Sequence, residues 1–453
     1  MVSVQDGRRK KIAVVGTGIS GLSAAWLLDK THDVTVYEKL QRVGGHSNTV
    51  IARIEDADAP IDTGFITYNP AAYPNFVEFL RVLQVETAPT DMSFAASLDG
   101  GRVEYSGSDV NGLFGQRANL LRPRFWSMLA TLARFYRQAP SDLMSGACEG
   151  LSLGAYLRRN RFEGAFKEWH ILPMAGAIWS ATPDEIMAYP AAAFIRFYDN
   201  HGLLNLSGRP QWRTLPGGSR EYVRKITQAL SREIRKGAPV ARVERSGDGV
   251  SVVDTEGGRE AFDQVVLATH ADEALALLGE PSAQERALLG AFRYSRNLAI
   301  LHTDETLMPK RRAVWSSWNY IGDVARPADK VCVTYWMNRL QPLSIKTNVF
   351  VTLNPPRPPR EGSVLATEDY THPLFDEPAI AAQNRLWSLQ GVRNTWFCGA
   401  YFGSGFHEDG LQAGLDVAER LGGMRRPWRV GHESGRIVVA PPGVGVSALG
   451  AAA

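Results

Sequence analysis

Three glycines and one acid near the N-terminus have the spacing of a dinucleotide-binding site. Gly16, Gly18 and Gly21 form the pattern Gly-x-Gly-x-x-Gly, and Glu38 lies about 22 residues after Gly16, close to the roughly 20 typical of such sites. Gly16 permits a tight turn, Gly18 has no Cβ to obstruct a pyrophosphate, and Gly21 allows the next helix to pack closely on the strand. Glu38 can bind the hydroxyl groups of a ribose.

The neighbouring sequence indicates the elements that hold these residues. Residues 11–15 are mostly apolar and β-branched, as expected of a buried parallel strand, and residues 34–38 resemble them. Between them a helix would begin at Ile19 and Ser20, whose N–H groups would face the phosphates. Lys39 is expected at the same site as Glu38, where an acid argues against a 2′-phosphate. The alternative is a glycine-rich turn that binds no ligand.

A second glycine pair indicates which dinucleotide is bound. Gly44 and Gly45, followed by His46, resemble the second glycine pair of large FAD-binding oxidoreductases, in which the chain crosses close to the pyrophosphate and ribityl groups. Dehydrogenases that use NAD have no need of such a pair, so the combination favours FAD. Taken alone, the segment could also be an ordinary glycine turn.

The nucleotide-binding pattern extends over three separated parts of the chain. These are residues 8–70, 210–275 and 390–423, and each contains strand-like runs. They predict one discontinuous α/β domain of the FAD-binding, Rossmann-like type. The intervening residues 71–209 and 276–389 predict an interleaved α+β substrate domain. Residues 424–453 are rich in Pro, Gly, Ala and Ser without hydrophobic periodicity, which predicts a disordered tail.

Composition and charge argue against several functional classes. A formal net charge of +3 over 453 residues gives no reason to expect a nucleic-acid partner. The three cysteines have no paired spacing, so neither disulfides nor a metal site is expected, and a reducing, cytoplasmic location fits. No run reaches the ~18 apolar residues needed to cross a bilayer. Residues 113–137 mix apolar residues with five arginines, which predicts either an ordinary insert helix or peripheral contact with the inner membrane face.

Segments spread over residues 10–422 resemble the FAD-dependent amine-oxidase-like superfamily. The closer resemblance is to predicted NAD/FAD-binding oxidoreductases that are partnered with methyltransferases of the cyclopropane-fatty-acid synthase type, or fused to them in plants. The resemblance implies FAD as the cofactor, a lipid acyl or other small-molecule substrate, and such a methyltransferase as a partner. The segments that carry it include residues 91–94, 119–123, 178–180, 208–212, 268–270, 335–338, 350–355, 396–401 and 405–411.

The same resemblance implies further cofactor contacts. Val240 would meet the adenine through its backbone. A helix beginning near Gly410 would direct its N–H groups at the flavin ring, because a helix N-terminus stabilises the negative charge of the reduced form. Ala400 stands where many superfamily members have an acid that holds the ribityl or pyrophosphate group. The other implied contacts are Ala268, Gly399, Asp409 and Leu411.

Three residues near the last strand are candidates for chemistry over the flavin. His407 flanks the turn expected to contact the flavin, and is either a base or a structural histidine. Glu408 either transfers a proton or complements the helix N-terminus. Tyr401 either lines the pocket or packs beneath the strand. Aromatic residues that could form an apolar tunnel are Trp179, Trp212, Tyr335 and Trp336.

Three functional hypotheses follow. The leading one is an FAD-dependent oxidoreductase that accepts hydride at flavin N5 from an unsaturated or modified fatty acyl chain, giving desaturation or isomerisation. The second is an amine oxidase, a class that usually has a lysine near N5, whereas the second insert offers only Lys310, Lys330 and Lys346 in polar, turn-like surroundings. The third is a flavin-binding partner of a lipid methyltransferase without redox turnover.

Overall fold

The three nucleotide-binding parts of the chain meet in one parallel sheet. The computed structural model describes residues 9–205, 208–324, 330–431, 433 and 435–439. The sheet has the order β19-β13-β1-β2, formed by Thr395–Phe397, Gln264–Leu267, Lys11–Val15 and Asp33–Tyr37. All its neighbouring strands are parallel, with Val15 opposite Leu267 on one side and Tyr37 on the other. Because β1 is central, its apolar residues are buried, as their β-branched composition predicts.

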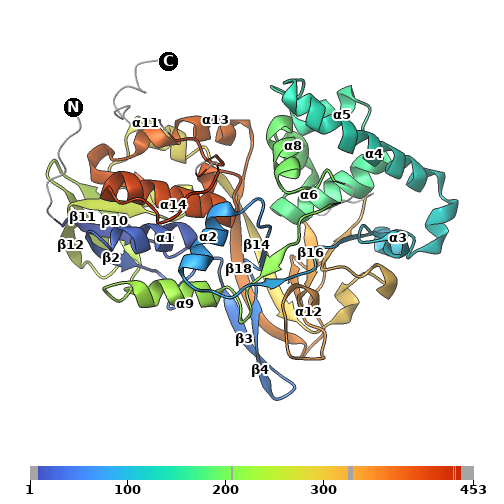
Figure 1. Cartoon of the computed structure of the whole chain (residues 1–453), viewed down its shortest axis with the longest axis horizontal. Coiled ribbons are helices and arrows are strands. Elements are labelled where there is room, and N and C mark those ends of the chain that lie inside the picture. Colours follow the sequence, from blue (N-terminus) through green and yellow to red (C-terminus); the bar gives the residue numbers. More distant parts are fainter. Residues whose placement is uncertain (1–8, 206–207, 325–329, 432, 434, 440–453) are drawn as a thin grey trace.

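The first and last helices of this domain pack directly against each other. α1 (Ile19–Leu28) and α14 (His407–Gly422) lie side by side, in blue and red in Figure 1. Glycines make this approach possible, since a Cβ at Gly414 would lie 2.2 Å from the carbonyl oxygen of Ser20 and one at Gly410 would lie 2.8 Å from Ser20 Oγ. The N-terminal and C-terminal parts of the chain therefore share one interface.

α14 begins one turn earlier than the sequence indicates. The predicted start is near Gly410, whereas the helix begins at His407. The Asp409 carboxylate accepts hydrogen bonds from the backbone N–H groups of Phe406 (2.8 Å) and Ser404 (3.0 Å). The helix start is thereby capped by a residue inside its own first turn.

Both inserts contribute strands to a second, seven-stranded sheet. Its order is β18-β14-β17-β16-β15-β7-β8, and β7 from the first insert pairs in parallel with β15 from the second. The two inserts therefore build one structure, although they are far apart in the sequence. The strands are β7 (Phe94–Leu98), β8 (Val103–Ser106), β14 (Arg293–His302), β15 (Trp318–Gly322), β16 (Cys332–Trp336), β17 (Phe350–Leu353) and β18 (Val364–Leu374).

Apart from α2 (Pro74–Val82), which packs on α14, the helices of the first insert gather beside this sheet, on the right of Figure 1. They are α3 (Val110–Leu113), α4 (Pro123–Met144), α5 (Leu153–Arg159), α6 (Leu172–Trp179), α7 (Pro183–Ala188) and α8 (Ala191–Asn200), with a short 3-10 turn, Arg117–Leu121, before α4. Their aromatic faces form much of the core, for example Phe194 stacked on Tyr198 with ring centroids 4.3 Å apart. Within the described ranges, no helix combines the length and apolar character needed to cross a bilayer.

Smaller elements complete the two units. The remaining helices are α2 (Pro74–Val82), α9 (Arg220–Ala229), α10 (Ala271–Leu277), α11 (Ala283–Leu289), α12 (Met337–Leu340) and α13 (Glu377–Leu386). The remaining strands are β3 (Thr49–Ile54), β4 (Ala57–Asp62), β5 (Thr67–Tyr68), β6 (Ala88–Pro89), β9 (Arg213–Thr214), β10 (Val240–Arg245), β11 (Val250–Asp254) and β12 (Arg259–Phe262).

The prediction of a disordered tail from residue 424 onward is wrong for the described part. Arg426 is buried and forms ion pairs with Asp416 (3.1 Å) and Glu419 (2.7 Å) of α14. Trp428 is buried against Trp26 of α1, with ring centroids 6.1 Å apart. Single ion-pair and aromatic contacts hold this segment, and such contacts leave no hydrophobic periodicity in the sequence. Residues 440–453 lie outside the described residues.

Candidate active site

One large cavity runs between the residues predicted to bind the cofactor and the two inserts. Its volume is about 1020 Å³, and it is lined by all three parts of the parallel-sheet domain and by both inserts. A drug-sized ligand pocket is typically about 300–1,000 Å³. The space therefore suits a dinucleotide together with a second molecule.

The glycine turn after β1 leaves room for a diphosphate. A Cβ at Gly18 would meet no atom within 4 Å, whereas one at Gly21 would lie 2.0 Å from the carbonyl oxygen of Gly16. Gly18 therefore faces open space and Gly21 makes a close contact between helix and strand, which are the two separate roles expected from the sequence. No side chain caps α1 at Gly18. The first N–H groups of α1 are thus free to bind an anion.

The second glycine pair lies directly against the first. A Cβ at Gly45 would lie 3.0 Å from Gly18 Cα, so the chain at residues 44–46 crosses the glycine turn. His46 follows and lines the cavity, and its buried Nε2 atom has no hydrogen-bond partner among the described residues. A buried polar atom of this kind calls for a partner. The open space at Gly18 and the ring of His46 fit the diphosphate of FAD.

The acid at the end of β2 faces the same cavity. Glu38 Oε2 accepts a hydrogen bond from the backbone N–H of Thr17 (3.2 Å) and another from the Thr17 hydroxyl, while Oε1 accepts one from Leu40 N–H (2.9 Å). These bonds fix the carboxylate beside the glycine turn, where a ribose hydroxyl would reach it. Lys39 lies at the rim, paired with Glu273 at 2.6 Å.

The structure separates the predicted cofactor residues into two groups. Gly21, Gly44, Asp409, Gly410 and Leu411 do not line the cavity but build its surroundings, and the wall here is formed by residues 404–406, which precede α14, and by its first residue, His407. The reason is the early start of α14, which places the last three one turn inside the helix. The residues that do line the cavity are Gly16, Gly18, Ile19, Ser20, Glu38, Lys39, Gly45, His46, Val240, Ala268 and Gly399.

Asp409 has a structural partner from the tail. Its buried carboxylate pairs with Arg436 at 2.6 Å, in addition to the two backbone N–H groups that it caps. Arg436 also donates to the carbonyl oxygen of Ala72, just before α2. The tail thus braces the start of α14, which is the helix end nearest the cavity.

His407 lines the cavity as a neutral imidazole. Its Nε2 lies 2.9 Å from Ser47 Oγ and 3.1 Å from the hydroxyl of Tyr222. Burial lowers the pKa of His407 to about 3, because the charged form would lose its hydration. The ring is fixed between these hydroxyls and Phe65, so the structural alternative for this histidine has direct support.

Glu408 is not a catalytic candidate, which corrects the expectation from its position in the sequence. Its carboxylate is fully buried outside the cavity and accepts hydrogen bonds from the backbone N–H groups of Asn75 (3.0 Å) and Phe76 (2.9 Å). These groups belong to the first turn of α2. Glu408 therefore caps a neighbouring helix, and burial raises the pKa of this carboxyl group.

Tyr401 lines the cavity and also packs beneath the last strand. Its ring lies 5.3 Å from Phe292 and 5.0 Å from Phe402, centroid to centroid. Its buried hydroxyl has no hydrogen-bond partner among the described residues. Burial raises the pKa of Tyr401 well above its usual value, so the hydroxyl stays protonated and can donate to a bound group.

The two inserts line much of the remainder of the cavity, and the part formed by the residues given at the end of this paragraph is called here the substrate half. Indole N–H groups of Trp179 and Trp318 point to no partner among the described residues. Trp336, expected in the same wall, instead packs on Trp315 and donates to Asn348 at 3.0 Å. The residues that define the substrate half are residues 90–94, Tyr105, Tyr136, His170, Met174, Ile178, Trp179, Phe197, residues 209–212, Trp318 and Tyr335.

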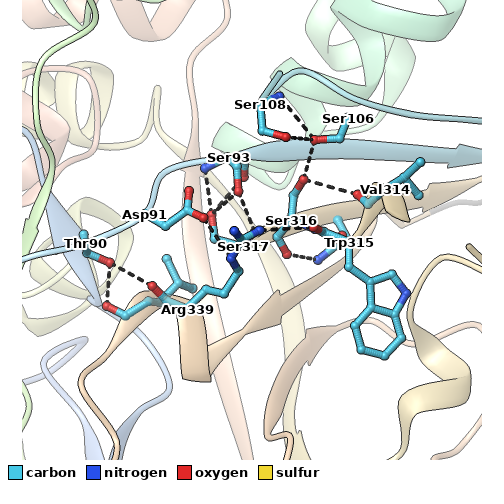
Figure 2. A network of polar contacts seen from close by, with 12 residues as sticks. Thr90, Asp91, Ser93, Ser106, Ser108, Val314, Trp315, Ser316, Ser317 and Arg339 are labelled. Carbon is cyan, nitrogen blue, oxygen red and sulfur yellow. Dashed lines mark hydrogen bonds and ion pairs between the residues drawn. The ribbon is translucent and has the colours of Figure 1, made fainter. Parts of the chain in front are cut away.

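Residues 90–94 form one wall of the substrate half and are held from behind by the network in Figure 2. Ser317 donates its backbone N–H to Ser93 Oγ (3.0 Å), and Ser317 Oγ accepts from Ser93 N–H (2.8 Å). Asp91 pairs with Arg339 at 2.9 Å. The acid of this wall is therefore neutralised by its own partner.

A polar cluster lies at the part of the wall formed by the first insert. His170 Nδ1 lies 3.2 Å from the Tyr105 hydroxyl, and Nε2 lies 3.3 Å from the Tyr136 hydroxyl. Burial, and next the charge of Arg209, lower the pKa of His170 to about 4. Arg209 donates Nε–H to the carbonyl oxygen of Asn205 at 2.9 Å and forms no ion pair within the described ranges.

Comparisons with known proteins agree with this geometry. Residues 19–310 match the family model of flavin containing amine oxidoreductases. The "Putative flavin-containing monoamine oxidase AofH" of Mycobacterium tuberculosis is 27% identical over 255 residues, which are 55% of each chain. An L-amino-acid oxidase of Siganus canaliculatus is 24% identical over 337 residues, 66% of this chain and 59% of that protein. The chain thus spans a little over half of the length of these relatives.

Solved structures share the fold at low sequence identity. A fatty acid isomerase from P. acnes that produces CLA superposes with a TM-score of 0.64 at 16% identity, covering 91% of this chain and 98% of that one. Putrescine oxidase bound to putrescine gives 0.65 at 14% identity, covering 91% and 99%. The predicted α/β, FAD-binding fold is therefore confirmed. The chain belongs to the family of flavin-containing amine oxidoreductases, and FAD is its cofactor.

Proposed function

We propose that the chain is an FAD-dependent oxidoreductase whose substrate is an unsaturated or modified acyl chain with an anionic end. The observation that carries this proposal is the charge of the substrate half. Among its described residues, Arg209 is the charged side chain without an ion pair, since Asp91 is paired with Arg339. Arg209 is exposed and lines the cavity, so a carboxylate or phosphate of a bound substrate would form a charge-assisted hydrogen bond with its guanidinium group.

The walls around Arg209 suit a long apolar chain. Trp179, Trp212 and Tyr335 line the substrate half together with aliphatic residues. Their surfaces would hold an acyl chain extended and exclude water from it. A solved neighbour of the same fold is a fatty acid isomerase, which supports the view that this fold accommodates such a chain.

The reaction follows from what the bound cofactor supplies. FAD would accept a hydride from an activated C–H bond of the substrate; loss of a proton from the neighbouring carbon to water would complete a desaturation, and return of the hydride to another carbon of the allylic system would complete an isomerisation. Arg209 would bind the anionic end and set how far the chain reaches into the cavity. His407 would hold its hydroxyl partners Ser47 and Tyr222 as a neutral group. The hydroxyl of Tyr401 would donate a hydrogen bond to a group bound in the cavity.

An amine oxidase is the second candidate, favoured by the named activities of relatives and neighbours. The substrate half argues against it, because an ammonium group would meet the cation Arg209 there and an acid already neutralised by Arg339. Lys310, Lys330 and Lys346 are exposed, and none of them lines the cavity. The association with a methyltransferase, implied by resemblance, stays a prediction.

Anaerobic incubation of the FAD-loaded protein with candidate substrates tests the proposal. We expect unsaturated fatty acids to reduce the flavin, seen as loss of its oxidised absorption band, or to be isomerised, seen as a shifted double bond in gas chromatography with mass spectrometry. Amines should do neither. Rapid flavin reduction by amines would support the second candidate. Absence of both reduction and product with unsaturated fatty acids and phospholipids would contradict the proposal.

Substitution of Arg209 tests its assigned role. Arg209→Gln should raise KM for a fatty acid about 10- to 100-fold with little change in kcat, because hydrogen bonds to charged groups contribute roughly 1.5–3 kcal/mol. The methyl ester of the same acid should be insensitive to the change. Arg209→Lys keeps the positive charge and should therefore raise KM less than Arg209→Gln does. Arg385→Gln, at an exposed arginine of α13, is the matched control. Equal changes of KM for the acid and for its ester would contradict the role of Arg209 in binding the anionic end of the substrate.

A further inference from the structure

Four large apolar side chains are exposed together on one short stretch of the first insert. Val110 is 72% exposed, Leu120 45%, Leu121 88% and Trp126 47%. We call these four residues the apolar face. They belong to α3, the 3-10 turn at residues 117–121 and the start of α4. Other exposed large apolar residues are spread over the rest of the described chain, so the clustering here is specific to this stretch.

Two hydrogen bonds and one ring contact connect the segments that carry Val110, Leu120 and Trp126, and Leu121 follows Leu120 directly in the chain. The Trp126 indole donates its N–H to the carbonyl oxygen of Leu120 at 3.0 Å. The Phe114 ring lies 5.6 Å from the Trp126 ring, and Phe114 N–H bonds to the carbonyl oxygen of Val110 at 3.1 Å. The members of the apolar face are therefore neighbours in space as well as in sequence.

The stretch is anchored, so its exposed side chains are held outward by buried neighbours. Asn119 is fully buried and donates to the carbonyl oxygen of Glu104 at 2.9 Å. Phe125 is fully buried, with its ring 5.8 Å from that of Tyr105. Leu120 and Leu121 stand beside Asn119, and Trp126 stands beside Phe125. A rigid base presents the apolar face to solvent.

The surrounding charge is positive. From residue 110 to residue 141 there is no aspartate, glutamate or lysine, and there are five arginines. Arg124 is paired with Glu168. Arg117 and Arg137 are exposed and form no ion pair among the residues that the structure describes. Residues 110–141 therefore carry a formal net charge of +5, whereas the whole chain carries +3.

We propose that the apolar face docks on an anionic lipid bilayer. Trp and Leu side chains at an interface would enter the headgroup region, while arginines would contact anionic lipid headgroups. A protein partner would more often match arginines with its own acids in fixed pairs and bury a larger surface than four side chains. An exposed apolar tip within a basic surround is instead typical of a peripheral membrane protein.

The docked orientation would bring the cavity wall close to the lipid. Tyr105 of β8 lines the cavity and touches Phe125, which lies beside the apolar face. Tyr136 of α4 lines it as well. α4 thus carries Trp126 of the apolar face and Tyr136 of the substrate half, whatever molecule that half takes.

Sedimentation with vesicles tests the proposal and needs no enzymatic activity. FAD-loaded protein should bind vesicles that contain phosphatidylglycerol, should bind pure phosphatidylcholine much less, and should be released by salt. The double variant Leu121→Ser/Trp126→Ser should weaken binding at least about tenfold. Arg117→Gln and Arg137→Gln should each weaken it about fivefold, at roughly 1 kcal/mol for each basic residue. Met144→Ser is the matched control, an 84% exposed apolar residue at the far end of α4.

Site-specific labelling locates the contact. The three native cysteines are buried, so a polarity-sensitive dye can be attached selectively to Leu121→Cys or Met144→Cys. Anionic vesicles should shift the emission of the first label to the blue and leave the second unchanged. Equal binding of the double variant and the native protein, or equal shifts of both labels, would overturn the proposal. The proposal would also be overturned if the native protein did not bind vesicles and formed a dimer that Leu121→Ser dissociates. That result would identify the apolar face as a protein contact.

Discussion

The imidazole of His407 lies flat on the ring of Phe65, with centroids 3.6 Å apart and planes inclined by 8°. Both residues line the cavity. Burial against an aromatic ring costs a neutral imidazole much less hydration free energy than it would cost an imidazolium. The contact therefore agrees with the lowered pKa of His407 and with a role in shaping the site.

A conservative replacement of His407 should separate shape from proton transfer. His407→Gln keeps a polar group near Ser47 and Tyr222, and we expect it to change kcat less than about tenfold, whereas loss of a general base typically costs about 10²–10⁴-fold. The pH profile of kcat/KM should keep its native inflections. A profile that loses an inflection in the variant would make His407 a proton-transfer residue. His407→Phe, which leaves both hydroxyls without this partner, should lower the unfolding free energy by about 1–3 kcal/mol.

Substitutions at two glycines of the same turn should affect different properties, FAD binding at Gly18 and stability at Gly21. Gly18→Val points into open space, so we expect a folded protein of near-native melting temperature that retains little FAD, because the side chain occupies the diphosphate position. Gly21→Ala places its Cβ 2.0 Å from the Gly16 carbonyl oxygen, so it should lower stability itself. Flavin absorbance per protein and thermal melting after removal of FAD distinguish the two. A normal FAD content in Gly18→Val would contradict the assignment of the site.

The tail should stabilise the protein through Arg436. Arg436→Leu leaves the buried Asp409 carboxylate without its ion pair, which typically costs about 3–5 kcal/mol. Arg425→Leu is the matched control, since Arg425 pairs with Glu433 at the surface, where such a pair contributes about 0–1 kcal/mol. Urea unfolding of both variants measures the difference. Equal unfolding free energies of the two variants would show that the Arg436–Asp409 pair does not stabilise the protein.

Buried histidines should make the protein sensitive to mild acid. Burial lowers the pKa of His170, His302 and His372 to about 4, while in the unfolded chain each titrates near 6.5. Above about pH 6.5 the two states bind the same number of protons. Below it the unfolded state binds more, so each histidine lowers stability by up to about 1.4 kcal/mol per pH unit until its folded pKa is reached.

The measurement is urea unfolding between about pH 7 and pH 5. His302→Gln, at a residue that does not line the cavity, should reduce the slope of stability against pH by the contribution of one group. Asp62 acts in the opposite direction because burial raises its pKa to about 6, so the folded state takes up a proton there. A stability that stays constant or rises over this range would contradict the prediction.

Much of the nucleotide-binding part could be predicted from local sequence. The roles of Gly18 and Gly21 depend only on the turn between one strand and one helix, and such contacts are encoded within a few residues. Glu38 also follows from spacing along a short unit. Glu408 could not be assigned in this way, because its partners Asn75 and Phe76 lie more than three hundred residues away in sequence.

The polar cluster of the substrate half gave no signal in the sequence. Tyr105, Tyr136 and His170 come from different elements and share no periodicity, so only the packing of β8 and α4 with the segment before α6 brings them together. Arg209 lies in a segment recognised by resemblance, but its lack of an ion pair depends on the folded surroundings. Chemistry assembled by tertiary contacts has no local pattern to detect.

The glycine contacts between α1 and α14 set an order for biosynthesis. The diphosphate turn at residues 16–21 leaves the ribosome early, yet the helix that packs on it is translated only at residues 407–422, and strand β19 comes shortly before. Until then, the surface of α1 around Ser20 stays uncovered and the parallel sheet lacks an edge strand. Stable retention of FAD therefore begins only when synthesis has passed residue 422. A nascent chain on a ribosome stalled earlier would carry an incomplete FAD-binding site.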